Sequence, residues 1–272
     1  MESLDRLGWV VGACFVAYGV RFGVRSNEPE VMAKLAEHMP PGWKPVSSPV
    51  VDHLYSFRVG GRPRRGVREY DVVYSGLVGI ARTLDRQIAY ERLAADLRQQ
   101  VAEKARREVF VHAGVVAWRG RALVIPGRSG SGKTTLVAEL IRAGAEYYSD
   151  EFAVIDALGR VHPFAKPLAI RDRKGNGVRM APVEALGGVS GSRPLRVGFV
   201  ALTEYRPTAR WRPVPVTRGQ GVLALLAHTA PVRRRPEASL AALERALEPA
   251  TIVKSLRGEA ERVAPLLLES LS

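Results

Sequence analysis

The chain has 272 residues, 46% of them hydrophobic and 25% charged, so it can bury the core of one large or two ordinary domains. Its formal net charge of +14 has two interpretations: basic residues spread over an ordinary surface, or a field that attracts an anionic nucleotide, acidic peptide or nucleic acid. Cys14 is the only cysteine, which excludes a disulfide or a multi-cysteine metal site within the chain.

The chain begins with an apolar stretch whose pattern is that of a strand. Residues 9–20 are too few to span a bilayer. The alternation of Val16, Tyr18, Val20 and further residues up to Val24 has a period of two, which favours a strand over a signal peptide. We therefore expect a strand that ends near Val24, no membrane segment and a cytoplasmic protein.

The rest of the first third predicts a small α+β domain. Residues 29–39 suit a short helix, and residues 50–57 and 67–74 suit the two strands of a hairpin across GGRPRRG. A long amphipathic helix is predicted over residues 82–107, because its leucines, isoleucine and valine recur at helical spacing. This helix is a natural border. The sequence therefore predicts an N-terminal α+β domain over residues 1–107, which we expect either to select the substrate or to cover the site.

Residues 108–272 predict an α/β domain, because apolar β-rich segments lead into glycine turns and helices. A helix is expected over TTLVAELIRAG, ended by Gly144, and the tail from Ser239 onward is predicted to be mostly helical. The expected strands are residues 109–118, 122–125, 152–155, 161–164, 168–170 and 197–202.

The sequence GRSGSGKTT, residues 127–135, matches the Walker A pattern G-x-x-x-x-G-K-[ST] between a predicted strand and a predicted helix. Its glycines allow backbone N–H groups to turn toward phosphate oxygens, while Lys133 reaches the outer phosphates and the Thr134 hydroxyl binds Mg²⁺. The pattern predicts a phosphate-binding loop. Its expected binding residues are Gly127, Ser129, Gly130, Ser131, Gly132, Lys133, Thr134 and Thr135.

Two acids and one histidine flank this loop in the sequence. Asp150 and Glu151 begin a strand-like segment, where a carboxylate near phosphate can hold a metal or accept the proton of an attacking hydroxyl. His112 lies within an apolar strand, where a histidine is either a hydrogen-bonded core residue or a functional group.

The three segments His112-Ala-Gly, GRSGSGKT and Ser149-Asp150-Glu151 together resemble the catalytic domain of HPr kinase/phosphorylase, a bacterial serine kinase with a P-loop. The resemblance is good over residues 109–170 and loose beyond them. It implies a P-loop kinase domain over residues 108–272, with ATP and Mg²⁺ as cofactors. It also implies that Asp150 is the base, that Glu151 helps Thr134 with the metal, and that His112 tunes the acidic pair.

The chain departs from that family at two places. Thr135 stands where the family usually has Glu, and IRDRKGNGVRM, residues 170–180, lacks the Glu that precedes the family's second signature. We therefore expect an acceptor other than HPr: a hydroxyl, with serine of a peptide or protein first and a small molecule such as free serine as the alternative. Lys166, Arg171 and Arg173 are candidates to stabilise the transferring phosphoryl group, or are ordinary surface bases.

Two further alternatives remain open from the sequence. The chain could be a nucleotide-dependent ATPase or switch that binds a partner and transfers phosphate only to water. The basic segments RPRRG and residues 233–235 are the reason to consider nucleic-acid binding. No aromatic residues lie between their arginines and no recognition motif is present, so nucleic acid is not the expected partner. The resemblance also suggests that the protein forms a homo-oligomer.

Overall fold

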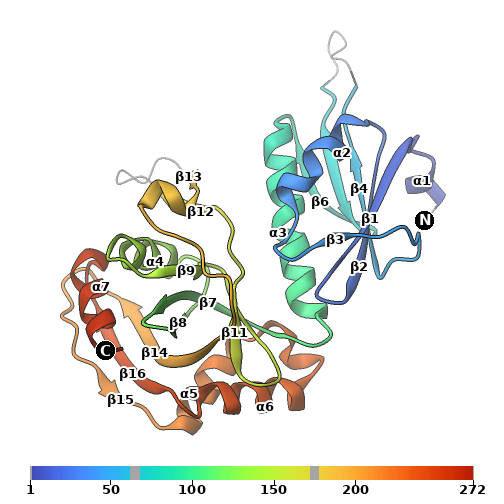
Figure 1. The fold of residues 1–272 in the computed structure, drawn as a ribbon. Helices are drawn as coiled ribbons and strands as arrows, with labels where there is room; N and C mark the ends of the chain where they lie inside the picture. Colours follow the sequence, from blue (N-terminus) through green and yellow to red (C-terminus); the bar gives the residue numbers. More distant parts are fainter. Residues whose placement is uncertain (1, 62–67, 172–177, 272) are drawn as a thin grey trace. The chain divides into compact units, whose positions relative to one another are not determined.

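The structure is a computed structural model that describes residues 2–61, 68–171 and 178–271. The chain divides into two compact units, Met1–Arg106 and Arg107–Ser272 (Figure 1). Each unit has its own sheet and its own helices, so the architecture is mixed α/β with more than one sheet.

The first unit is a six-stranded sheet in the order β3-β1-β2-β4-β5-β6, with the long helix α3 packed on β5 and β6. Its core includes Phe22, Tyr55 and Leu93, all fully buried. The elements are α1 (Glu2–Asp5), β1 (Val11–Ala17), β2 (Val20–Ser26), α2 (Glu30–Leu35), η1 (Ala36–His38), β3 (Lys44–Pro45), β4 (His53–Arg58), β5 (Asp71–Ser75), β6 (Val78–Thr83) and α3 (Arg86–Lys104).

A strand does end near Val24, because β2 runs to Ser26, but the alternating segment is not one continuous strand. It is a hairpin of β1 and β2, with Phe15 opposite Phe22. Tyr18 and Gly19 form the turn and have φ values of 49° and 79°. Two consecutive left-handed residues are what a tight two-residue hairpin turn requires, and the period-two pattern does not register such a reversal.

The predicted long helix is shorter than expected, because its first residues belong to strand β6. Helix α3 begins after Asp85, whose Oδ1 accepts a 2.9 Å hydrogen bond from the Gln87 N–H as an N-cap. It ends where Ala105 leaves the helical region with ψ of 135°. The predicted helix over residues 29–39 is confirmed as α2 followed by η1. The predicted hairpin corresponds to β4 and β5, which pair antiparallel.

The second unit is built on an eight-stranded sheet in the order β11-β10-β7-β8-β14-β16-β15, with β9 on β7. Strand β14 runs parallel to both β8 and β16, and β12 with β13 forms a separate pair. The elements are β7 (Val109–Trp118), β8 (Arg121–Pro126), α4 (Lys133–Arg142), β9 (Glu146–Ser149), β10 (Phe152–Ile155), β11 (Arg160–His162), β12 (Leu168–Arg171), β13 (Val178–Ala181), η2 (Val183–Leu186), β14 (Leu195–Tyr205), β15 (Val214–Pro215), α5 (Arg218–Leu226), η3 (Ala230–Arg233), α6 (Pro236–Leu247), β16 (Thr251–Arg257) and α7 (Ala260–Glu269).

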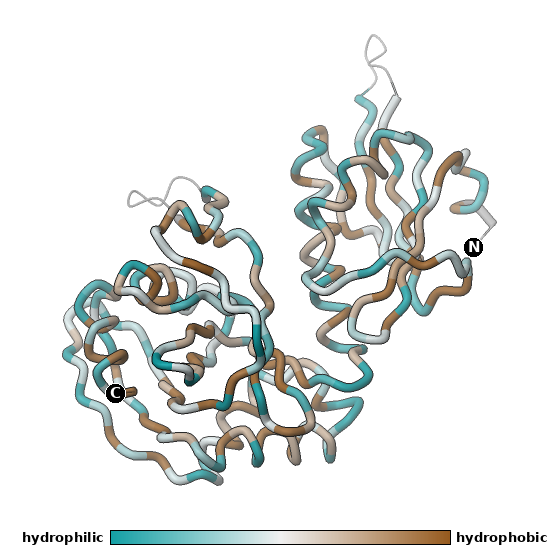
Figure 2. The backbone as a smooth tube through the Cα atoms, viewed as in Figure 1, coloured by the Kyte–Doolittle hydropathy of each residue, from teal (hydrophilic) through white to brown (hydrophobic). Residues whose placement is uncertain are grey.

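Helices cover both faces of this sheet. Along β8, Ala122 and Val124 join a core with residues of α5 and α6, whereas Leu123 and Ile125 join a core with residues of α4 and α7. Successive strand residues point to opposite faces, so a continuous apolar strand fills two cores. The hydrophobic segments of this unit gather around the central strands (Figure 2).

The prediction of a mostly helical tail from Ser239 is wrong in part, because β16 lies between α6 and α7. This strand inserts beside β14, from Phe199 opposite Thr251 to Tyr205 opposite Arg257. In the described part of the chain, no helix combines the length and the apolar character needed to cross a bilayer.

Candidate functional site

The glycine loop joins the end of β8 to the start of α4, the strand–loop–helix setting that the sequence predicted. Gly130 and Gly132 have φ values of 82° and 79°, a region that only glycine adopts freely. A Cβ on Gly132 would also lie 2.7 Å from a guanidinium nitrogen of Arg257. The loop therefore needs glycine at position 132 both for its backbone conformation and for the close approach of Arg257.

Lys133 is the first residue of α4, and its side chain turns back across the loop. Its Nζ donates hydrogen bonds of 2.8 Å to the carbonyl oxygens of Gly127 and Arg128. The residue is only 9% exposed, and this burial lowers the pKa of the Lys133 ammonium, while the charges of Asp150 and Glu151 act to raise it. The ammonium is a buried cation held by neutral carbonyl groups, and an anion in the loop would compensate it better.

Asp150 lies in the bend between β9 and β10 and is 6% exposed. Its Oδ2 accepts a 2.9 Å hydrogen bond from the Thr134 hydroxyl on α4, and its Oδ1 accepts a 3.0 Å bond from the Tyr147 hydroxyl. Burial, and then the charge of Asp150, raise the pKa of Tyr147, so its phenol remains a donor. The structure thus brings together the loop threonine and the first acid that the sequence singled out.

Lys166 links the two acids. Its Nζ lies 2.9 Å from Asp150 Oδ1 and 3.5 Å from Glu151 Oε2. The Glu151 side chain is the more exposed of the two carboxylates, at 26% against 3% for Asp150. Lys166, which the sequence analysis named as a candidate to stabilise the phosphoryl group, therefore lies within the acidic cluster. Its positive charge neutralises part of the negative charge of the two adjacent carboxylates.

The oxygen groups beside α4 suit a hard divalent cation in type but not in number. A hydroxyl and a carboxylate are ligands that Mg²⁺ accepts, and it usually takes the remaining ligands from water and substrate phosphates. Within residues 2–61, 68–171 and 178–271, no group of three or more His, Cys, Asp or Glu side chains is arranged to hold a metal by itself. The cluster fits a metal that arrives with a phosphate ligand.

His112 lies on β7, opposite Phe152 of β10, and its ring centroid is 4.5 Å from that of Phe152. Its backbone also supports the loop: the Gly127 N–H donates to the His112 carbonyl at 3.1 Å, and the His112 N–H donates to the His228 carbonyl at 2.8 Å. The next residue, Ala113, donates its N–H to the Glu151 carbonyl at 3.2 Å. Strand β7 therefore connects the start of the loop with the acidic pair.

The other predicted site residues are placed as follows. Ser129 and Thr135 are exposed, and Arg171 is the last residue of β12. Arg173 and the rest of residues 172–177, in the segment that departs from the family's second signature, lie outside the described residues.

Arg257 was missed by the sequence analysis. It ends β16, is 2% exposed, and donates from Nη2 to the carbonyl oxygens of Ser131 and Gly132 at 3.2 and 3.1 Å. Its Nε is buried with no hydrogen-bond partner among the described residues, and burial lowers the pKa of the guanidinium. Its only sequence signal was a strand pattern in a segment that we predicted to be helical.

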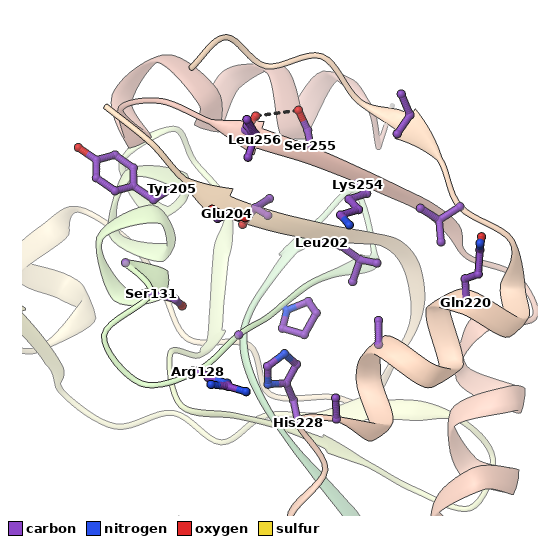
Figure 3. Close-up of a pocket in the computed structure, with 18 of the residues that line it drawn as sticks. Arg128, Ser131, Leu202, Glu204, Tyr205, Gln220, His228, Lys254, Ser255 and Leu256 are labelled. Carbon is purple, nitrogen blue, oxygen red and sulfur yellow. Dashed lines mark hydrogen bonds between the residues drawn. The ribbon is translucent and has the colours of Figure 1, made fainter. Parts of the chain in front are cut away.

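A cleft of about 1500 Å³ opens beside the loop (Figure 3). The loop from Gly127 to Gly132 forms one wall, and the ends of β14 and β16 with α5 form the others. His228, also missed by the sequence analysis, lines the cleft close to the loop, and burial, followed by the charges of Lys133 and Arg128, lowers the pKa of its imidazole.

The second unit is thus an α/β protein with a Walker A loop at the end of a central strand and a buried acid beside the loop threonine. No family model matches the chain, and no curated protein matches it. Among solved structures, the chain resembles the HPr(Ser) kinase/phosphatase from Coxiella burnetii, with 18% sequence identity over 60% of this chain and 92% of that chain. The TM-score is 0.33, so the likeness carries no functional argument and the residues themselves must carry it.

Proposed function

We propose that the second unit is an ATP- and Mg²⁺-dependent kinase of HPr-kinase type. Its acceptor is a hydroxyl, with serine of a peptide or protein as the leading class. The observation that carries the proposal is the 2.9 Å hydrogen bond between the Thr134 hydroxyl and the buried Asp150 carboxylate, directly after a loop that holds a buried lysine. Walker A threonine, lysine and a nearby acid are the groups that phosphoryl transfer from a nucleotide requires.

Binding of the triphosphate is assigned to the loop and Lys133. The loop N–H groups and the N-terminus of α4 attract phosphate oxygens. Lys133 exchanges its two carbonyl partners, Gly127 and Arg128, for oxygens of the outer phosphates, which gives the buried ammonium an anionic partner.

Thr134 would hold Mg²⁺ with the help of Glu151, and the Thr134 hydroxyl also contacts one oxygen of the proposed base Asp150. The metal, when bound, neutralises negative charge on the phosphates. Tyr147 and Lys166 fix the other oxygen of Asp150, which keeps the carboxylate oriented while ligands exchange.

Proton transfer is assigned to the same carboxylate. Asp150 accepts the hydrogen bond of the acceptor hydroxyl and takes its proton, while the acceptor oxygen bonds to the γ-phosphorus and the bond from that phosphorus to ADP breaks. Lys166 is the cation nearest to Asp150 in this cluster, and it offsets charge that spreads over the transferring group. His112 supports the acids through strand β7.

The test is transfer of radiolabelled γ-phosphate from ATP to serine-containing peptides, to free serine and to water. Wild-type protein should label a hydroxyl acceptor, and Asp150→Asn should lower the rate at least about 100-fold, because the proposed base is lost. Asp156→Asn is the matched control, since Asp156 is bonded to His162 and Arg160 in the turn after β10.

Undiminished transfer by Asp150→Asn would remove the proposed base. Rapid phosphate release to water, with no labelled acceptor in any mixture, would instead identify an ATPase or switch.

A further inference from the structure

The cleft beside the glycine loop has no role in the phosphate chemistry described above. Its apolar lining includes Leu202 and Leu256 at the strand ends, Val216 before α5, and Ala224 on α5. Gln220 of α5 and Lys254 of β16 add polar groups to the same walls (Figure 3). Leu256 is 43% exposed even though it is the second-last residue of β16, which lies between β14 and β15 in the sheet. The cleft is therefore an accessible space whose walls combine apolar side chains with polar and charged ones, a lining that suits a small molecule with both kinds of surface.

The cleft and the acidic cluster lie on opposite sides of the loop. Strand β8 leads into the loop, and its neighbours in the sheet are β7 on one side and β14 on the other. Asp150 follows β9, which pairs with β7. The cleft residues Leu202 and Leu256 belong to β14 and β16, on the other side. Ligands of open α/β sheets bind outside the carboxyl ends of parallel strands, and here β8, β14 and β16 all end at the cleft.

This arrangement determines the direction of a bound nucleotide. In a Walker A loop the lysine contacts the β- and γ-phosphates and the threonine binds their metal. The γ-phosphate must therefore lie on the side of Thr134 and Asp150. The rest of the donor has to leave the loop elsewhere, and the cleft is continuous with the loop from Gly127 to Gly132.

We propose that this cleft binds the nucleoside part of the phosphate donor, with the base between the apolar ends of β14 and β16 and the face of α5. The inference rests on the proposed function and adds to it the source of donor selectivity. A purine offers two flat apolar faces and a polar edge. The walls match both features, because Leu202, Leu256 and Ala224 present apolar surface and Gln220 presents an amide.

The experiment compares ATP with inorganic tripolyphosphate by calorimetry in the presence of Mg²⁺. Both ligands use the loop, but only ATP uses the cleft, so wild-type protein should bind ATP at least about tenfold more tightly. Ala224→Trp fills the cleft, and Leu256→Asn removes an apolar contact at an already exposed position. Each should weaken ATP binding about tenfold or more and leave the tripolyphosphate affinity unchanged.

Leu158→Asn is the matched control, because Leu158 is exposed in the turn between β10 and β11 and does not line the cleft. It should change neither affinity. Circular dichroism and Tm identify a variant that fails to fold. If Ala224→Trp fails to fold, the comparison of Leu256→Asn with wild-type protein decides the result.

Equal affinity of wild-type protein for ATP and tripolyphosphate would overturn the inference and leave the loop chemistry intact. A raised acceptor KM with unchanged ATP affinity in both cleft variants would assign the cleft to the acceptor, and would also overturn it. Failure of wild-type protein to bind either ligand would remove the proposed function itself, so the two failures are distinguishable.

Discussion

At the scale of single residues, the loop is held from two directions. Lys133 binds the carbonyl groups at its beginning, Gly127 and Arg128, and Arg257 binds those at its end, Ser131 and Gly132. These four carbonyl oxygens are engaged by cations, and the N–H groups of Gly127 and Ser131 donate to the carbonyl oxygens of His112 and Arg128. The N–H groups that bind an incoming anion must therefore come from the other residues of the loop.

Replacing Arg257 tests this description. Arg257→Met removes both hydrogen bonds that Nη2 donates to the loop carbonyls, and hydrogen bonds from a charged group are worth about 1.5–3 kcal/mol each. We expect ATP and tripolyphosphate affinities to fall together, by about tenfold or more, since the loop serves both ligands. Calorimetry measures this, and Arg257→Lys should recover part of the loss because it restores one cation.

A loss restricted to ATP would place Arg257 among the cleft residues instead of the residues that hold the loop. Unchanged affinity for both ligands would show that the two carbonyl contacts do not shape the loop.

The residues that the sequence could identify are those within a local pattern. Gly132, Lys133 and Thr134 follow from their spacing alone, and Asp150 from its place after a strand. Arg257 and His228 could not be found in this way, because each reaches the loop from an element more than 90 residues away along the chain. Their role depends on which strands and helices become neighbours in the sheet.

At the scale of elements, helix α5 forms a wall of the cleft, and its first turn is fixed by a capping box. The Thr217 hydroxyl accepts a hydrogen bond from the Gln220 N–H, and the Gln220 side chain accepts one from the Thr217 N–H at 3.2 Å. Gln220 also lines the cleft. The residue that starts the helix thereby fixes a residue that faces the proposed nucleoside.

Thr217→Ala should destabilise the second unit by about 1 kcal/mol, the usual cost of losing an N-cap side chain. Thermal unfolding measures the change as a lower Tm. Combined with Gln220→Ala, the loss should be less than the sum of the two single losses, because each removes the same reciprocal contact. Strictly additive losses would contradict the capping box.

The elements that the sequence predicted best are continuous apolar segments. Strand β7 has the predicted bounds, Val109–Trp118, because burial on both faces of the sheet leaves an uninterrupted hydrophobic stretch. Strand β16 was missed. Its seven residues, TIVKSLR, lie between two helices and carry polar residues at exposed positions, and they form a strand through pairing with distant β14.

At the scale of the whole molecule, three half-buried histidines make stability depend on pH. Burial is the largest cause that lowers the pKa of His38, His53 and His228 below the ordinary 6.5. The unfolded chain therefore binds more protons than the folded chain just below pH 6.5. Stability is fully present above this value and is lost as the pH falls from 6.5 toward the lowered folded values.

We expect Tm to be lower at pH 5.5 than at pH 7.5. The variant His53→Gln should make the Tm of the first unit depend less on pH. An equal or higher Tm at pH 5.5 would contradict the proposed direction.

The position of Lys133 affects how selective the loop is for its ligand. The ammonium already binds Gly127 and Arg128, so an incoming anion competes with an internal ligand. A ligand that binds the Lys133 ammonium therefore has to replace two hydrogen bonds of 2.8 Å. Under the proposed function, adjacent phosphates of one nucleotide would do this together, and the loop would discriminate against single small anions.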